Sequence, residues 1–166
     1  MPQNRFYPDE QFKEIEINAS LQLKYAISNR GRLISFTDEI ENGRILKGGL
    51  SDGYPTFRFK VKKDDKIVNK YLFLYKLVAQ YFIPKQSEDQ TYVLHLDYNR
   101  SNDDASNLRW ATKEEMMAHS RKSPRVIQGK KNLIEHNLKA DGRKLTTTKV
   151  MLIKKILARP EQKTLL

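Results

Sequence analysis

The side chains best suited to chemistry in this 166-residue chain are concentrated in residues 92–122. Two of the three histidines, His95 and His119, stand in this segment, and an asparagine- and aspartate-rich stretch lies between them. Imidazole exchanges protons near neutral pH, and carboxylate oxygens bind hard divalent cations. Proton transfer or metal-assisted chemistry is therefore expected here. The chain has no cysteine, which excludes disulfides, thiolate zinc sites and cysteine nucleophiles.

The elements that would position these histidines are two strands, a long loop between them and a helix. Residues 92–112 have the residue order typical of a strand, a loop and a second strand. Thr112, with Glu115 three residues later, is a capping-box pattern that predicts a helix extending to Lys122. Asparagine and aspartate side chains hydrogen-bond to nearby backbone groups, so the loop can hold a fixed shape without regular structure.

A hairpin and a buried helix are predicted upstream. Residues 25–36 indicate two short strands around a turn, in which Asn29 and Gly31 tolerate the positive φ that such turns need. Residues 74–82 carry apolar side chains at helical spacing, and Pro84 ends the predicted helix. We expect this helix to belong to the core and assign it no chemistry.

A second hairpin is predicted from residues 54–62 and 67–73, with its turn at residues 64–65. In its first strand, apolar side chains alternate with cations, so one face is expected to pack and the other to be cationic. The apolar residues are Phe57, Phe59 and Val61. The cations are Arg58, Lys60 and Lys62. Such a row can follow a phosphate backbone, although the polar-outward alternation of an ordinary sheet gives the same pattern.

The net charge of +11 is unevenly distributed. Residues 1–119 hold 18 Lys and Arg against 17 Asp and Glu, whereas residues 120–166 hold 13 against 3. The basic C-terminal segment favours a polyanionic partner, with a solvated helical tail as the alternative. Its charge alone does not distinguish DNA, RNA and an anionic membrane. No apolar run resembles a signal peptide or a membrane span, so we expect a cytoplasmic protein without a membrane partner, nucleoid-associated in a bacterium or phage.

One pattern of residues has a specific parallel. It runs His95-Leu-Asp97-Tyr-Asn99, then Asn102, then Asn107-Leu-Arg-Trp110-Ala-Thr112, and ends with Glu115 and His119. This pattern resembles the ββα-metal (His-Me finger) motif of HNH endonucleases, and most closely the phage and homing type. Residues 25–35 resemble the nuclease-associated modular DNA-binding domain that commonly precedes that motif, and residues 74–84 resemble its linking helix.

The resemblance implies roles for particular residues. In the family, a histidine ending the first strand is the general base that activates water, and an asparagine starting the second strand hydrogen-bonds its ring. By position these are His95 and Asn107. One divalent ion, magnesium or manganese, is held by the residue before the histidine and by one nine positions beyond the asparagine. Leu94 and Met116 occupy those positions and offer no oxygen ligand.

Two other residues are candidates to replace the missing metal ligands. His119 lies one helical turn after Met116, and Asp97 offers carboxylate oxygens. Each candidate also has a structural alternative. His95 is explained equally well as a histidine retained for the strand, and His119 as a histidine on the helix surface. Trp110 is expected to fill the core of the motif.

Cations in several elements are expected to contact nucleic acid, because phosphate oxygens attract them without regard to base sequence. The expected contact residues are Arg30, Arg32, Arg58, Lys60, Lys62, Arg100, Arg109, Arg121, Lys122, Lys130, Lys131 and Lys149.

The C-terminal segment is predicted to be helical. Residues 126–138 follow a break at Pro124, and residues 145–157 are predicted to form a second, amphipathic helix. The resemblance implies the start of a helix-turn-helix module here, without its recognition helix, so base reading from this segment is not expected. The alternative is that the apolar helix packs on the body of the protein or on a protein partner.

The expected fold is α+β, with small antiparallel β hairpins, a buried helix, a ββα unit and a basic helical tail. The expected regions are a modular DNA-binding part with its linking helix (1–90), an HNH-like motif (91–122) and the tail (123–166). The leading hypothesis is a duplex-DNA-binding protein of HNH homing-endonuclease descent with weak or lost cleavage. The alternatives are an active metal-dependent endonuclease or nickase that uses His95, and a basic structural subunit of a ribonucleoprotein or other assembly.

Overall fold

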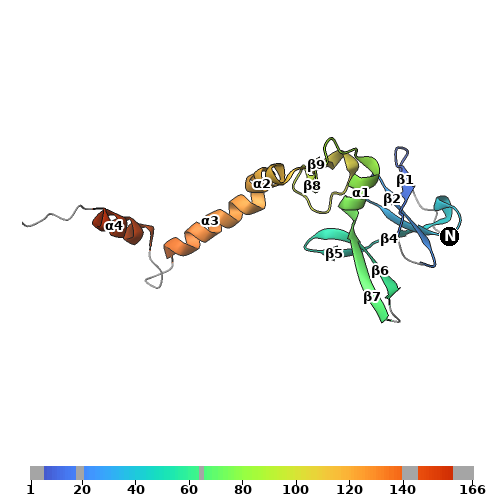
Figure 1. Cartoon of the computed structure of the whole chain (residues 1–166), viewed down its shortest axis with the longest axis horizontal. Helices are drawn as coiled ribbons and strands as arrows, with labels where there is room; N and C mark the ends of the chain where they lie inside the picture. Colours follow the sequence, from blue (N-terminus) through green and yellow to red (C-terminus); the bar gives the residue numbers. More distant parts are fainter. Residues whose placement is uncertain (1–5, 18–20, 64–65, 140–145, 159–166) are drawn as a thin grey trace, which may run out of the picture. The chain divides into compact units, whose positions relative to one another are not determined.

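The computed structural model describes residues 6–17, 21–63, 66–139 and 146–158. The chain divides into two compact units, Met1–Ser120 and Arg121–Leu166. Small antiparallel sheets and a packed helix form the first unit, and the second is helical in its described residues (Figure 1). The α+β fold class is therefore confirmed. The regions expected at 1–90 and 91–122 fall almost entirely within one compact unit.

The first sheet has four antiparallel strands in sequential order. They are β1 (Phe12–Glu14), β2 (Lys24–Ser28), β3 (Leu33–Phe36) and β4 (Arg44–Leu46), with a short 3-10 helix, η1 (Ile40–Asn42), before β4. The first predicted hairpin is β2–β3, and Gly31 in its turn has a φ of +74°. Asn29 does not use the positive φ that its residue type tolerates, since Asp52 and Tyr98 are the non-glycine residues of the described part that have one. Asn29 instead uses its side chain to donate to the carbonyl of Asp9.

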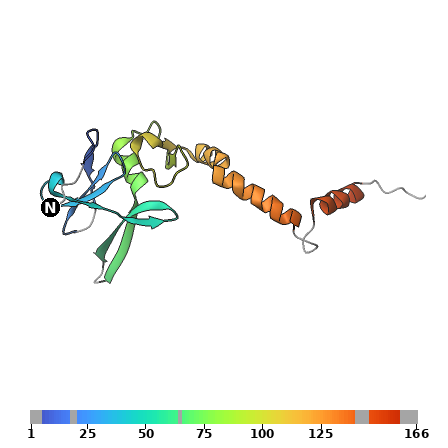
Figure 2. The same cartoon turned by 180° about the vertical axis from the view of Figure 1, so that it is seen from behind.

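The second sheet contains the cationic strand. It comprises β5 (Gly49–Ser51), β6 (Tyr54–Lys63) and β7 (Lys66–Phe73), so the second hairpin is confirmed, although its turn at residues 64–65 lies outside the described residues. In β6 the apolar positions are buried or half-buried and the cations Arg58, Lys60 and Lys62 are exposed, as the alternation predicts. Residues 66–71 of β7 are exposed on both faces, because this end of the β6–β7 ribbon extends away from the first sheet (Figure 2).

Helix α1 (Leu74–Phe82) has the predicted bounds and lies in the core of the first unit. Leu74, Leu77 and Val78 share one face of the helix and are buried. The hydrophobic cluster around them includes Phe57 of β6 and Leu108 of the later ββα unit. Because both sheets and the ββα unit share this core, the segments on either side of residue 90 fold together.

The ββα unit has the predicted order. Strand β8 (Tyr92–His95) pairs antiparallel with β9 (Leu108–Ala111), a short 3-10 helix, η2 (Ala105–Asn107), lies between them, and α2 (Lys113–Lys122) follows. The capping box is confirmed: Thr112 N donates to Glu115 Oε2 at 2.9 Å, and Glu115 N donates to Thr112 Oγ1 at 3.3 Å. Trp110 Nε1 donates to the carbonyl of Ile83 at 2.9 Å, which ties the unit to the end of α1.

The second unit contains α3 (Pro124–Lys139) and α4 (Thr147–Leu157), both predicted from the sequence. Neither helix has a buried residue. The hydroxyl of Thr146 caps α4 by accepting from Lys149 N at 3.3 Å. The expected second helix of a helix-turn-helix falls in residues 159–166, outside the described residues. Among the helices described, none combines the length and the apolar character needed to cross a membrane.

Candidate functional site

His95 stands at the end of β8 with its ring bound to an aspartate. Its Nε2 lies 2.8 Å from Asp103 Oδ1, and the two side chains are 6% and 3% exposed. The rings of Tyr54 and Tyr75 pack against the imidazole, with centroid distances of 5.7 and 5.1 Å. When Asp103 is ionised, Nε2 must donate the hydrogen bond, which leaves Nδ1 as the proton acceptor of a neutral ring.

Asp103 is held by the turn of the first hairpin. Gly31 of that turn abuts it, and Ala105 N donates to the carbonyl of Asn29 at 2.7 Å, which fixes the loop against the turn. Burial raises the pKa of Asp103, and its hydrogen bond with His95 opposes this shift. Its second oxygen, Oδ2, is buried without a hydrogen-bond partner in the described part of the chain. The carboxyl group is therefore committed to the histidine.

Tyr75 is a neutral neighbour of this pair. Burial raises the pKa of Tyr75 to about 12, with smaller contributions from Tyr54 and Asp103. The phenol therefore stays protonated near neutral pH and is no proton acceptor beside His95.

The side chain of Asn107 bonds within the loop, which corrects the expected contact between Asn107 and the ring of His95. Its Oδ1 accepts from Asp97 N at 3.1 Å, and its Nδ2 donates to Asp97 Oδ1 at 3.0 Å and to the carbonyl of Asn102 at 2.8 Å. These three bonds use the amide to close the base of the loop. The residue that bonds the ring of His95 is instead Asp103, which precedes Asn107 in the loop.

The two candidate replacement ligands also have other contacts. Asp97 accepts from Asn102 Nδ2 at 2.8 Å, and this bond is the main cause that lowers the pKa of Asp97. His119 stacks on Tyr98, with ring centroids 4.2 Å apart and an interplanar angle of 22°. Tyr98 has a φ of +61°, a strained conformation for a residue with a Cβ. Asp97 thus accepts hydrogen bonds that hold the loop together, and His119 packs helix α2 against Tyr98 of the loop.

The resemblance assigns Leu94 and Met116 to the positions that hold the divalent ion in the HNH family, and neither side chain has an oxygen ligand to offer. Leu94 is 5% exposed and belongs to the core, and Met116 lies half-buried on α2. Leu94 and His95 are neighbours in a strand, so their side chains point to opposite faces. Within residues 6–17, 21–63, 66–139 and 146–158, no group of three or more His, Cys, Asp or Glu side chains is placed to hold a metal ion. The donor set does not fit the ion that the resemblance implies.

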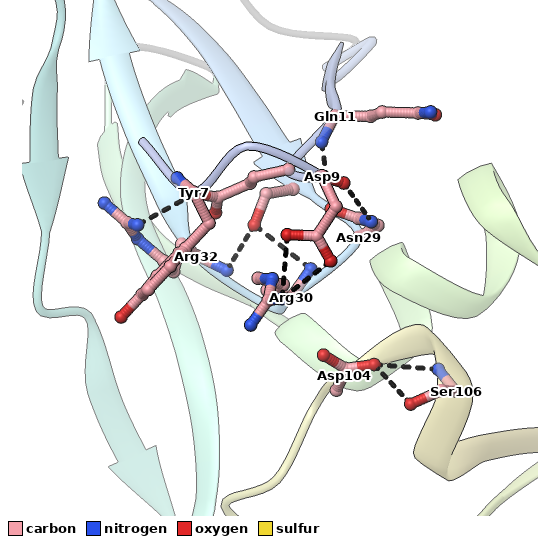
Figure 3. Close-up of polar contacts among 10 residues, drawn as sticks. Tyr7, Asp9, Gln11, Asn29, Arg30, Arg32, Asp104 and Ser106 are labelled. Atoms are coloured by element: carbon pink, nitrogen blue, oxygen red, sulfur yellow. Dashed lines mark hydrogen bonds and ion pairs between the residues drawn. The ribbon is translucent and has the colours of Figure 1, made fainter. Parts of the chain in front are cut away.

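Arg30 and Arg32, two of the expected nucleic-acid contacts, are engaged by acidic residues of the N-terminal segment. Figure 3 shows Arg30 beside Asp9. Arg30 Nη2 lies 2.9 and 2.7 Å from the two carboxylate oxygens of Asp9. Arg32 Nη1 lies 2.8 Å from Oε2 of Glu10, whose side chain has no exposed area. Both guanidinium groups lie over the ring of Tyr7, 4.6 and 5.3 Å from its centroid. These arginines hold the N-terminal segment on the first sheet.

Arg100 links the ββα loop to the turn between β5 and β6. Its Nη1 donates to the carbonyl of Asp52 at 2.8 Å, and its guanidinium lies 4.8 Å from the ring centroid of Tyr54. Since Tyr54 also packs on His95, Arg100 supports the wall of the histidine site. Arg100 therefore has a structural role, and its expected contact with nucleic acid stays a prediction.

The remaining expected cations are exposed. Arg58 Nη2 donates to the carbonyl of Leu50 at 2.8 Å, and Arg109 Nη1 pairs with Glu115 Oε1 at 2.9 Å. Both arginine side chains remain at the surface. The other exposed cations of the expected set are Lys60, Lys62, Arg121, Lys122, Lys130, Lys131 and Lys149.

The sequence patterns did not identify the partners of His95. Asp103 is one of three aspartates in residues 97–104, and nothing in their spacing distinguishes it. Tyr54 and Tyr75 come from distant elements, where alternation and helical spacing predict packing without naming the neighbour. The burial of His95 and Asp103 depends on the tertiary fold, so local sequence patterns could not predict their pairing.

Comparisons with known proteins found one motif match, two similar proteins and one similar solved structure. Residues 10–60 match the NUMOD4 motif. Two uncharacterized HNH endonucleases of Acanthamoeba polyphaga mimivirus are similar, one 34% identical over 86 residues (52% of this chain, 20% of the relative) and one 36% identical over 96 residues (57% and 26%). A solved structure described as "DNA binding and cleavage by the HNH homing endonuclease I-HmuI" is 25% identical, with a TM-score of 0.48 and coverage of 89% of this chain and 67% of that chain.

This chain spans about a quarter or less of the length of the mimiviral relatives. The matched segments include the first hairpin, whose turn contacts the loop that carries Asp103. The resemblance is therefore confirmed: the chain carries a NUMOD4 motif and is similar to HNH endonucleases.

Proposed function

We propose that this chain is a duplex-DNA-binding protein of HNH homing-endonuclease descent in which cleavage is weak or lost. The observation that carries this proposal is the state of His95, whose Nε2 is bound to Asp103 in a nearly closed site, while Leu94 and Met116 occupy the family's ligand positions. The chain keeps a histidine at the position of the general base, but it has Leu94 and Met116 where the family has metal ligands.

The loss of cleavage follows from the charge that phosphodiester hydrolysis develops. A divalent ion supplies the stabilisation of the scissile phosphate and the leaving oxygen in this class of reaction. An isobutyl group and a thioether present no oxygen to a hard cation. His95 alone can accept a proton but cannot balance the charge on the phosphate.

DNA binding is supported by the exposed cations of β6 and by the relatives, which are named endonucleases. Lys60 and Lys62 stand on alternate residues of an extended strand, so they form a row suited to backbone phosphates. The net charge of +11 adds a general attraction for a polyanion.

The active-nuclease alternative has one observation in its favour. A carboxylate bound to one imidazole nitrogen orients the ring and stabilises its protonated form, which is the arrangement of a working general base. The His95–Asp103 pair has this geometry. Cleavage by this pair requires a metal site other than the one at positions 94 and 116.

The proposal is tested by fluorescence anisotropy with a labelled mixed-sequence duplex in EDTA, with structured RNA as the competitor. We expect the duplex to bind with a log–log salt slope of about −0.9 for each phosphate contacted, and RNA to compete weakly. RNA that competes better than unlabelled duplex would favour the ribonucleoprotein alternative. The absence of duplex binding at low salt would contradict the proposal.

A further inference from the structure

Two surface hollows among the described residues of the first unit differ in charge. One, of about 620 Å³, is lined by Glu14, Glu16, Lys24 and apolar residues, so its lining opposes a polyanion. The other, of about 380 Å³, lies where β7 ends and α1 begins, and falls within the usual size range of small-ligand sites. Its lining residues are Tyr71, Leu72, Phe73, Lys76, Leu77 and Gln80. Lys76 is the charged residue among them.

The smaller hollow, which we call the Tyr71 hollow, has an apolar lining with polar groups. Leu77 is buried, whereas Tyr71 is 55% exposed, and the rings of Tyr71 and Phe73 are perpendicular, with centroids 5.4 Å apart. Lys76 Nζ lies 5.6 Å from the ring centroid of Phe73. Gln80 is exposed on α1 and is one of the residues that line the hollow. An exposed aromatic ring, an ammonium group and an amide are thus gathered at one place.

The Tyr71 hollow adjoins the cationic row. Tyr71 is the cross-strand partner of Arg58, so the two side chains share one face of the ribbon with Lys60 and Lys62. On its other side, Phe73 contacts the ring of Tyr54, at 5.9 Å between centroids. Tyr54 in turn packs against His95. The hollow therefore lies between the phosphate-binding row proposed above and the histidine site.

We propose that the Tyr71 hollow binds an unpaired nucleobase of a DNA strand, stacked on the ring of Tyr71, with a neighbouring phosphate at Lys76. This inference rests on the proposed DNA binding. Every base presents a flat π face and a hydrogen-bonding edge, which match the tyrosine ring and the Gln80 amide. The surrounding cations select a polyanionic strand over a neutral aromatic ligand. Bases within an intact duplex cannot reach the ring, so a base already outside the stack is the preferred occupant.

The test compares two duplexes of the same flanking sequence, one fully paired and one with a single bulged 2-aminopurine. Anisotropy gives their affinities, and 2-aminopurine fluorescence reports stacking directly. We expect the bulged duplex to bind at least about 5-fold tighter and its fluorescence to be quenched, since one base–aromatic stack changes affinity about 5- to 100-fold. Tyr71→Leu should abolish both effects, whereas Tyr71→Phe, which keeps a π face, should retain them.

Tyr92→Leu is the matched control, because Tyr92 is an exposed tyrosine of the same unit outside the hollow and should keep the preference. Gln80→Ala is a second probe and should reduce the preference without altering affinity for the paired duplex. Equal affinity of the unmodified protein for the two duplexes would overturn the inference and leave DNA binding intact. Unchanged quenching in Tyr71→Leu would also overturn it. Failure to bind either duplex would remove the proposed function and this inference together.

Discussion

Gly31 lies directly against Asp103: a Cβ atom placed on Gly31 would stand 2.6 Å from the Cβ of Asp103. Gly31 belongs to the NUMOD4 motif, and Asp103 is the partner of His95. The turn between β2 and β3 therefore supports the histidine site through its contact with Asp103 as well as connecting two strands of the first sheet. This relationship makes the N-terminal motif and the ββα loop parts of one structure.

Gly31→Ala should destabilise the fold by at least about 2 kcal/mol, because a left-handed residue with a Cβ is strained and the new methyl group meets Asp103. Gly53→Ala is the matched control, since Gly53 has a φ of +81° but the nearest atom to the added Cβ would be Cδ of Arg100, at 3.7 Å. Urea unfolding of both variants separates the two causes. Equal losses in the two variants would show that the contact with Asp103 contributes nothing.

Glu10→Gln should lower the free energy of unfolding by about 1–3 kcal/mol, because it removes the carboxylate charge beside Arg32 at a site where the Glu10 side chain is fully buried. Asp9→Asn removes an equal charge from the neighbouring pair, where the aspartate side chain is 67% exposed and screened by solvent, and should cost less stability than Glu10→Gln. Thermal unfolding compares the two. A larger loss in Asp9→Asn would reverse the assignment of the Arg32–Glu10 pair as the stabilising contact.

Two aspartates of one loop should give opposite pH dependence of stability. The pKa of Asp97 lies below its ordinary 3.8, so its contribution is present above that value and is lost as pH falls through the folded-state pKa. The pKa of Asp103 lies above 3.8, so its contribution is present below that value and is lost as pH rises through the folded-state pKa.

Asp97→Asn should therefore reduce the loss of folding stability that occurs as the pH is lowered. Asp103→Asn should remove a loss of folding stability that occurs as the pH rises above 3.8. The measurement is the free energy of unfolding as a function of pH for the parent chain and each variant, compared by slope rather than by absolute value. Slopes that change in the same sense in both variants would contradict the opposite shifts.

The cations of β6 should contribute more to DNA binding than those of α3. Replacing Lys60 and Lys62 with glutamine should reduce the log–log salt slope by about 2, since each lost phosphate contact removes about 0.9. Lys130→Gln with Lys131→Gln removes the same charge from α3 and should change the slope less. Anisotropy titrations at several salt concentrations give both values. A larger change from the α3 pair would assign the phosphate contacts to the helical tail.

The elements of this fold follow from local patterns, and the contacts of the site do not. Alternation over residues 54–62, helical spacing over 74–82 and the capping box at Thr112 each depend on nearby residues, and all three are confirmed. The partner of His95 depends on which side chain of the loop lies against the hairpin turn, and this contact between distant segments is a tertiary property. For the same reason Arg30 and Arg32 have the appearance of free cations in the sequence and are paired in the fold.

We propose that cleavage at the site around His95 is weak or lost, and the most direct measurement is nicking of supercoiled plasmid in magnesium and in manganese. The chain and its His95→Ala variant are compared at equal concentration, with EDTA as the metal-free control. We expect the chain to nick little or no more plasmid than the variant does in either metal. Nicking that requires the metal and disappears in His95→Ala would contradict it.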